Sequence, residues 1–337
     1  MKILKKLVQA GFIAAAILPA LWAVTPDALL ILRAASGGPP KPYQGRMISL
    51  ITSGKQSHSS DVAVYARPPN SYKRDFFSPS EELEKVVVSD GETEWIYFPM
   101  KKMAWKGDSK KTQPRILSDE DVWILLSKNY NIQLRGSDQI AGRDTWVVQI
   151  LPRDEGKPKR AVWIDKDEPV ILQSKEYHPD GSLATQSHFV KIEFLDDLPE
   201  ELFRFDPKNM TVKEHGLDPD FLSMEELQKS GAGILRLPQK LPEGFIFESG
   251  NFFTFHGKEV THLRYTDGLT VMSLFESSVP ISSDDKTFNW KPFDLDRGTI
   301  GLSKAGKVIR WKSKGRYFAL VGNLSAPALE RVAKSLR

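Results

Sequence analysis

Short apolar runs separated by tight-turn residues are the feature that most constrains the fold of this chain. Val86–Val88 and Trp95–Phe98 flank Asp90-Gly91, and Asp-Gly between two such runs is the strongest short signal for a β-hairpin. The same order of run, turn and run recurs around Asp180-Gly181 and Asp267-Gly268. Successive hairpins build antiparallel sheets, so the sequence predicts a mainly β protein of the α+β class.

The strand pattern of residues 43–194 is interrupted by one helix. Ser118, with Asp121 three residues later, is typical of a capping box, and Leu125 and Leu126 follow at helical spacing. A long series of hairpins curls upon itself, and a helix inside such a series packs most simply on the open side. We therefore predict a curved antiparallel half-barrel plugged by one or two helices.

The strand pattern stops near Pro207 and resumes near Leu237. Between them Ser223 and Glu226 mark a short helix, and Gly231–Gly233 ends it, so we interpret residues 207–236 as a linker. Further strands and the Asp267-Gly268 turn then predict a smaller antiparallel sheet. The spacing of the apolar residues from Leu329 to Leu336 predicts a terminal helix that packs on this sheet.

The first 35 residues have the pattern of an export signal. Three lysines (Lys2, Lys5 and Lys6) precede an apolar stretch over residues 7–24 that Pro19 interrupts, and small residues around Ala23 suit cleavage near position 23. A retained inner-membrane anchor is the alternative, because residues 28–32 prolong the apolar stretch. Both interpretations place the rest of the chain outside the inner membrane, in the periplasm. The absence of cysteine excludes a lipid-attachment thiol and disulfides.

The charge balance argues against a nucleic-acid partner. Charged residues make up 27% of the 337-residue chain and apolar residues 40%, as in a soluble globular protein. Removal of the three N-terminal lysines lowers the formal net charge from +4 to about +1. Such a chain has no excess of cations to follow a phosphate backbone.

No residue pattern assembles a catalytic, cofactor or metal site. Gly301–Lys307 matches the start of a phosphate-binding loop, but Val308 stands where a hydroxyl is required, and the following residues alternate as in a strand. The six histidines lack the spacing of metal ligands. His58, Ser60 and Asp61 are too close in sequence to converge as a hydrolytic triad. We predict a protein that is not an enzyme and that has no cofactor.

Large aromatic side chains recur along the strand pattern of residues 43–194, at Trp95, Tyr97, Trp105, Trp123, Trp146 and Trp163. Any one of them is explained by ordinary core packing, but a half-barrel is too concave to be filled from one side. Large apolar side chains on its inner face would form a pocket for an acyl chain, in which each buried methylene contributes about 0.8 kcal/mol. As ligand-binding residues of this hydrophobic pocket we propose Trp95, Tyr97, Trp105 and Trp146.

Several segments resemble known families in their order along the chain. Six segments between residues 68 and 203 are similar to the LolA/LolB lipoprotein-carrier superfamily: Pro68–Phe76, Val88–Gly91, Glu94–Tyr97, Val162–Asp165, Tyr177–Gly181 and Leu198–Phe203. Three segments of the second half resemble the C-terminal domain of the MucB/RseB family: Leu241–Phe245, His262–Leu269 and Val321–Leu324. The resemblance implies a LolA/LolB-like half-barrel domain over residues 36–206 and a MucB/RseB C-terminal-like domain over residues 237–337.

The same resemblance implies a function. A MucB/RseB family protein would be a periplasmic regulatory protein of the sigma-E envelope-stress response. It would bind the periplasmic domain of an anti-sigma factor and respond to lipid or lipoprotein acyl chains. The alternative is a periplasmic lipid or lipoprotein carrier of the LolA type. We further predict that a switch of the first kind couples its two domains through the linker.

Overall fold

The computed structural model describes residues 27–53, 56–109, 117–214, 221–230, 235–255, 257–281, 290–293, 298–303 and 306–336. The predicted export signal up to residue 26, with its cleavage position, lies outside the described residues, as does the predicted helix end at Gly231–Gly233.

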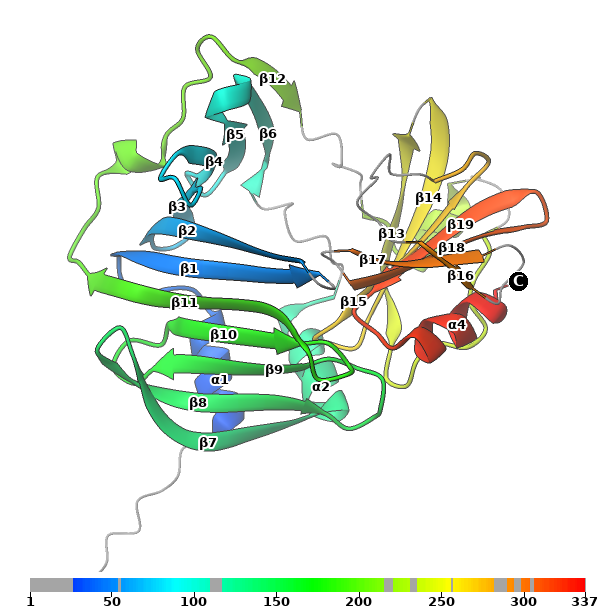
Figure 1. Cartoon of the computed structure of the whole chain (residues 1–337), viewed down its shortest axis with the longest axis horizontal. Coiled ribbons are helices and arrows are strands. Elements are labelled where there is room, and N and C mark those ends of the chain that lie inside the picture. Colours follow the sequence, from blue (N-terminus) through cyan, green and yellow to red (C-terminus); the bar gives the residue numbers. More distant parts are fainter. Residues whose placement is uncertain are drawn as a thin grey trace, which may run out of the picture.

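Within the described residues the chain forms two β-sheets that lie side by side (Figure 1). The first sheet holds twelve described strands: β1 (Tyr43–Ser53), β2 (Gln56–Arg67), β3 (Ser71–Phe77), β4 (Leu83–Ser89), β5 (Thr93–Phe98), β6 (Met103–Asp108), β7 (Tyr130–Ile140), β8 (Arg143–Pro152), β9 (Lys159–Asp165), β10 (Ile171–Tyr177), β11 (Leu183–Phe194) and β12 (Thr211–Glu214). Their order is β12-β6-β5-β4-β3-β2-β1-β11-β10-β9-β8-β7. With its helices, this sheet is the first unit.

The second sheet holds the seven strands described after residue 245. They are β13 (Ile246–Phe255), β14 (Lys258–Thr266), β15 (Val271–Ser277), β16 (Lys291–Phe293), β17 (Gly298–Ser303), β18 (Gly306–Ser313) and β19 (Arg316–Gly322). Their order is β13-β14-β15-β19-β18-β17-β16, with every pair antiparallel. With its helices, this sheet is the second unit. The predicted fold class is confirmed: the described chain is mainly β, with two sheets, few helices and a terminal helix.

One pairing departs from the expected antiparallel pattern. β12 runs parallel to β6 and makes the first sheet mixed, with Thr211 opposite Met103. Within the segment 207–236, interpreted as a linker, the described residues are thus divided between the units. β12 extends the first sheet, whereas the short helix α3 (Met224–Lys229) packs on β13 and buries Leu227 in the second core.

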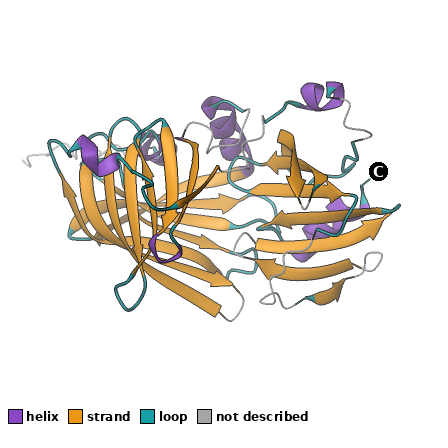
Figure 2. Cartoon of the chain, turned by 90° about the horizontal axis from the view of Figure 1, so that it is seen from above, coloured by secondary structure: helices purple, strands orange, loops and turns teal. Residues whose placement is uncertain are grey.

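The first sheet curves around two helices (Figure 2). α1 (Ala28–Ser36) and α2 (Asp119–Asn129) bury Leu32 and Leu126 against Val148 and Ile164 of the sheet. We call the face of the sheet that carries these helices the concave face. Residues 28–32, which the sequence assigns to the signal or anchor region, therefore begin a helix that is part of the first unit.

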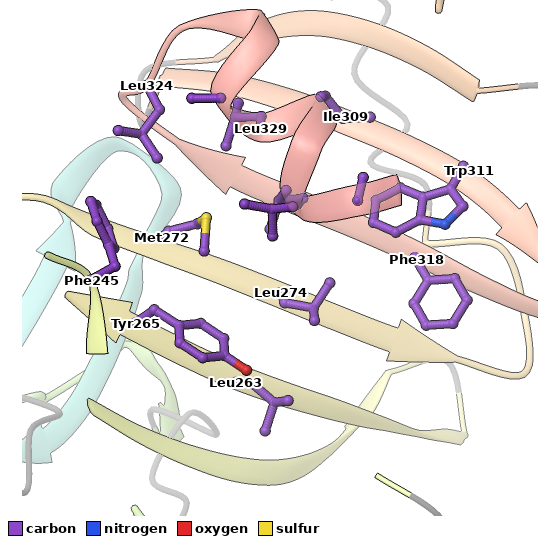
Figure 3. Close-up of a cluster of buried hydrophobic side chains, with 14 of the residues drawn as sticks. Phe245, Leu263, Tyr265, Met272, Leu274, Ile309, Trp311, Phe318, Leu324 and Leu329 are labelled. Carbon is purple, nitrogen blue, oxygen red and sulfur yellow. The ribbon is translucent and has the colours of Figure 1, made fainter. Parts of the chain in front are cut away.

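The second unit is built around its terminal helix. α4 (Ala326–Lys334) carries an apolar stripe that includes Leu329 and Val332, both at least 98% buried. Leu329 lies over the sheet residues Ile309 and Met272 in a continuous apolar cluster (Figure 3). Each large apolar side chain buried in this way stabilises the fold by about 2 kcal/mol.

The phosphate-loop-like segment is a β-hairpin. Gly301 lies in β17 and Lys307 in β18, which pair antiparallel, with Ser303 opposite Gly306. A phosphate-binding loop requires a helix N-terminus after the glycines. Here strand β18 stands where that helix would have to begin, so the segment does not have the structure of a phosphate-binding loop, in agreement with the sequence-based prediction.

Candidate functional site

A cavity of about 490 Å³ opens in the first unit, within the size range of small-molecule sites. It lies at the ends of five neighbouring strands, β1 to β5, next to the short 3-10 turn η1 (Pro99–Lys101). Its lining residues are Ser49, Ile51, His58, Ser60, Phe76, Glu82, Leu83, Glu84, Lys85, Phe98, Met100 and Lys101.

Strand register places this cavity on the concave face. Side chains directly opposite one another in a sheet point to the same side. One row of opposed residues crosses from the cavity to the helices: Ser60, Ser49, Ser187, Ser174, Val162 and Val148. Val148 packs in the cluster formed by α1 and α2. The helices and the cavity therefore share one face, and the helices fill only part of it.

The cavity combines apolar walls with charged groups. Phe76 and Phe98 provide apolar surface, and each carries a lysine ammonium over its ring, Lys85 at 3.8 Å and Lys101 at 5.5 Å from the ring centroids. Met100 is 78% exposed at the η1 turn, which borders the cavity. This arrangement suits a ligand with an apolar chain and a polar end.

The His58, Ser60 and Asp61 group does not form a triad. His58 and Ser60 point into the cavity from alternate positions of β2, with Nε2 and Oγ 3.3 Å apart. Asp61 is the next residue of the strand, so its side chain points to the opposite face, where it accepts a hydrogen bond from Arg46 Nε at 2.7 Å. Asp61 therefore does not orient the histidine as the carboxylate of a triad would.

The four predicted aromatic residues lie on two faces of the sheet. Trp95 and Tyr97 lie on the convex face against Phe205, whose ring centroid is 5.2 Å from that of Trp95 and 4.2 Å from that of Tyr97. Burial raises the pKa of Tyr97, and the nearby Asp75 carboxylate raises it further.

The other two aromatic residues lie on the concave side. Trp105 packs edge-on against Phe98, a cavity residue, with ring centroids 5.7 Å apart. Trp146 is opposite Ile164 in the β8–β9 pair, and Ile164 packs in the helix-covered cluster. The structure therefore brings Trp105 to the edge of the cavity, leaves Trp146 on the same face opposite a residue of the helix-covered cluster, and separates both from Trp95 and Tyr97.

The residues that line the cavity follow no motif in the sequence. Each strand supplies one to three of them, and register alone brings pairs such as Ile51 with His58 and Phe76 with Lys85 together. Alternation in β2 shows that His58 and Ser60 share a face, but strand order is needed to identify that face as concave.

In the described part of the chain, no three His, Asp or Glu side chains are grouped to hold a metal ion. No helix in the same residues has the length and apolar character needed to cross a membrane.

Comparison with known proteins finds a family model that matches part of the first unit, a curated protein of similar sequence, and solved structures of similar fold. Residues 85–207 match the model of the MucB/RseB N-terminal domain. The sigma-E factor regulatory protein RseB of Haemophilus influenzae is 26% identical over 166 residues, which cover 49% of this chain and 50% of RseB. The chain thus spans about half the length of that curated relative.

Solved structures extend the likeness to nearly the whole chain. MucB in the Pseudomonas aeruginosa MucA/MucB complex has a TM-score of 0.59 at 18% identity, over 93% of this chain and 99% of that one. A second structure, MucB in complex with MucA(peri), has a TM-score of 0.57 at 16% identity, over 92% and 97% of the two chains. At these identities the likeness shows a shared fold.

Proposed function

We propose that the chain, whose residues 85–207 match the MucB/RseB N-terminal domain, is a regulatory protein of the periplasm that binds the periplasmic part of an anti-sigma factor. The regulatory family to which it is similar is non-enzymatic, and we infer a binding function for this chain as well. We further propose that the first unit of this chain binds a lipid or lipoprotein acyl chain.

The observation that carries the proposal is the shared two-unit architecture. The likeness to MucB covers 93% of this chain, so it includes both sheets rather than the half-barrel alone. In that solved structure MucB is in complex with MucA. A carrier with only a lipid-binding domain would have no use for the second sheet, whereas a regulator needs a surface for its partner.

The lipid proposal rests on the cavity of the concave face. Its volume of about 490 Å³ and its apolar residues, including Ile51, Phe76 and Leu83, suit an acyl chain. Lys85 and Lys101 would lie near a polar or anionic end group. Of the four predicted aromatic residues, we assign Trp105 to the wall beside Phe98, and Trp146 remains a proposed residue of the same face.

The partner is tested in the source bacterium with the full chain. We expect reversible cross-linking followed by mass spectrometry to recover one membrane-spanning protein with a cytoplasmic sigma-binding domain, and the purified periplasmic part of that protein to bind this chain in isothermal titration calorimetry. Recovery of many lipoproteins instead, without an anti-sigma factor, would contradict the proposal and favour the carrier.

The ligand is tested by fluorescence titration with dansyl-undecanoic acid. A carboxylate placed in an apolar cavity is strongly disfavoured, so Phe76→Asp should weaken binding of the probe by at least about tenfold. Val190→Asp is the matched control, because Val190 is 51% exposed and does not line the cavity. Equal affinities of the two variants for the probe would show that the probe binds outside this cavity.

A further inference from the structure

The end of α2 is fixed to the second unit by buried polar contacts. Asn129 Nδ2 donates to the backbone oxygens of Gly244 at 3.1 Å and Asp267 at 2.9 Å. The Tyr130 hydroxyl, directly after the helix, donates to the Asp267 carboxylate at 2.9 Å. Lys157 Nζ, from the β8–β9 connection, lies 3.5 Å from that carboxylate. We call this set the α2 junction.

The α2 junction is closed to solvent. The side chains of Asp267 and Lys157 are 0% and 2% exposed, and Tyr130 is 1% exposed. Burial raises the pKa of Tyr130, and the Asp267 charge raises it further, so the phenol stays protonated and donates. Removal of one partner would leave a buried polar group or charge unpaired, which is costly. The junction is therefore expected to open as a whole rather than contact by contact.

The junction also leaves no space between the units. A Cβ on Gly244 would meet Asn129 Oδ1 at 1.9 Å, and one on Gly268 would meet the backbone nitrogen of Leu126 at 2.6 Å. The Asp267 carboxylate accepts from the backbone N–H of Thr270 at 2.9 Å, which fixes the turn itself. A rigid turn packed this closely must move when α2 moves.

The same helix packs in the core of the concave face. Leu126 is 4% exposed and contacts the cluster that includes Val148 and Ile150. Leu269, from the turn of the second unit, packs against this cluster as well. One helix therefore touches both the sheet that carries the cavity and the turn that positions the other unit (Figure 1).

We propose that the α2 junction sets the orientation of the two units and that displacement of α2 within the concave face releases it. This coupling element replaces the linker, because the described linker residues are divided between the sheets. The proposal deepens the proposed function and rests on it for the lipid that would displace α2. The junction itself can be tested without any ligand.

A second contact between the units does not involve α2 and provides a control. Asn323, after β19, donates to Glu176 Oε1 at 2.9 Å, and its Oδ1 lies 2.9 Å from His178 Nδ1. These residues join the β10 end of the first sheet to the second unit. If every contact between the units contributed equally to their relative orientation, loss of the Asn323 contact would change that orientation as much as loss of the α2 junction.

The test measures the distance between the units by pulsed electron paramagnetic resonance. The chain has no cysteine, so Lys191→Cys in β11 and Lys258→Cys in β14, both exposed, accept spin labels selectively. In this background we compare Asn129→Ala and Leu126→Ala with two controls. Ile124→Ala changes a 56% exposed residue of the same helix, and Asn323→Ala removes the second contact.

We expect one narrow distance distribution for the labelled parent and both controls, and loss of the single distance in Asn129→Ala and Leu126→Ala. Circular dichroism checks that each variant is folded, and Asn129→Ala, which leaves the apolar core intact, decides the test if Leu126→Ala does not fold. A distribution that stays narrow in Asn129→Ala would overturn the proposal, as would equal broadening in Asn323→Ala.

Addition of dansyl-undecanoic acid separates the coupling from the lipid proposal. If the probe binds, it should broaden the distribution of the parent but cause no further change in Asn129→Ala. A bound probe that leaves the parent distribution unchanged overturns the release step. If the probe does not bind, the lipid proposal fails, whereas the ligand-free comparison still decides whether the α2 junction sets the orientation.

Discussion

At the scale of single residues, His262 of β14 shows how burial controls a charge. Its ring stacks on Phe275 with centroids 4.3 Å apart, and Nε2 lies 3.0 Å from Ser273 Oγ. Burial lowers the pKa of His262 to about 3, with a further contribution from the positive charge of Arg264. The folded protein therefore keeps this imidazole neutral at pH values where the unfolded chain protonates it.

This difference predicts a loss of stability in acid. The unfolded histidine has a pKa of about 6.5, so below that pH the unfolded state binds a proton that the folded state excludes until about pH 3. The free energy of unfolding should fall by up to about 1.4 kcal/mol per pH unit in this window. Urea unfolding at pH 7 and pH 5 should show a smaller decrease for His262→Gln than for the unchanged chain. Parallel decreases would mean that another group is responsible.

At the scale of elements, α2 begins where the sequence predicts. Ser118 Oγ accepts from the backbone N–H of Asp121 at 3.1 Å, and the Asp121 carboxylate accepts from the Ser118 N–H at 3.2 Å. This is the predicted capping box, and Ser223 with Glu226 forms the second one at α3. Such caps depend on residues three apart, so the sequence alone is enough to identify them.

Loss of the α2 cap should destabilise the first unit. Ser118→Ala leaves the N–H of Asp121 without its side-chain acceptor and should lower the free energy of unfolding by about 1 kcal/mol. Ser118→Thr keeps a hydroxyl acceptor and should recover most of that loss. Thermal unfolding of the three proteins measures the effect, and equal midpoints would show that the cap contributes nothing.

Short sequence motifs predict the hairpins, the helix caps and α4. They do not predict which distant segments pair with each other. The parallel pairing of β12 with β6 joins residues about a hundred positions apart in the sequence, and no turn residue marks it. Alternation likewise predicts that Trp95 and Tyr97 share a face. It does not say that Phe205 covers that face or that Trp105 points to the other.

At the scale of the whole molecule, the two units have separate cores but share buried polar contacts. The cluster around Leu126 and the cluster around Leu329 have no residue in common. Asn129 nevertheless reaches Gly244 and Asp267 in the second unit through hydrogen bonds of about 3 Å. Stability of one unit is therefore expected to depend on the other through these contacts and through Leu269, which packs against the cluster around Leu126.

Two glycines with the same backbone conformation allow this dependence to be measured. Gly244 and Gly142 both have φ of +75°, so alanine at either position costs about 1–2 kcal/mol of backbone strain. A Cβ at Gly142 meets nothing within 4 Å, whereas one at Gly244 displaces the Asn129 amide. Gly244→Ala should cost about 2 kcal/mol more, because two buried hydrogen bonds are lost.

Differential scanning calorimetry of both variants tests whether the units unfold together. We expect one transition for the unchanged chain and for Gly142→Ala, since the α2 junction stays closed in both. In Gly244→Ala the units should separate, and two transitions should replace one, because each sheet retains its own apolar core while the contacts between them are lost. A single transition in Gly244→Ala, shifted only as far as in Gly142→Ala, would show that the polar junction does not couple the stabilities of the two units.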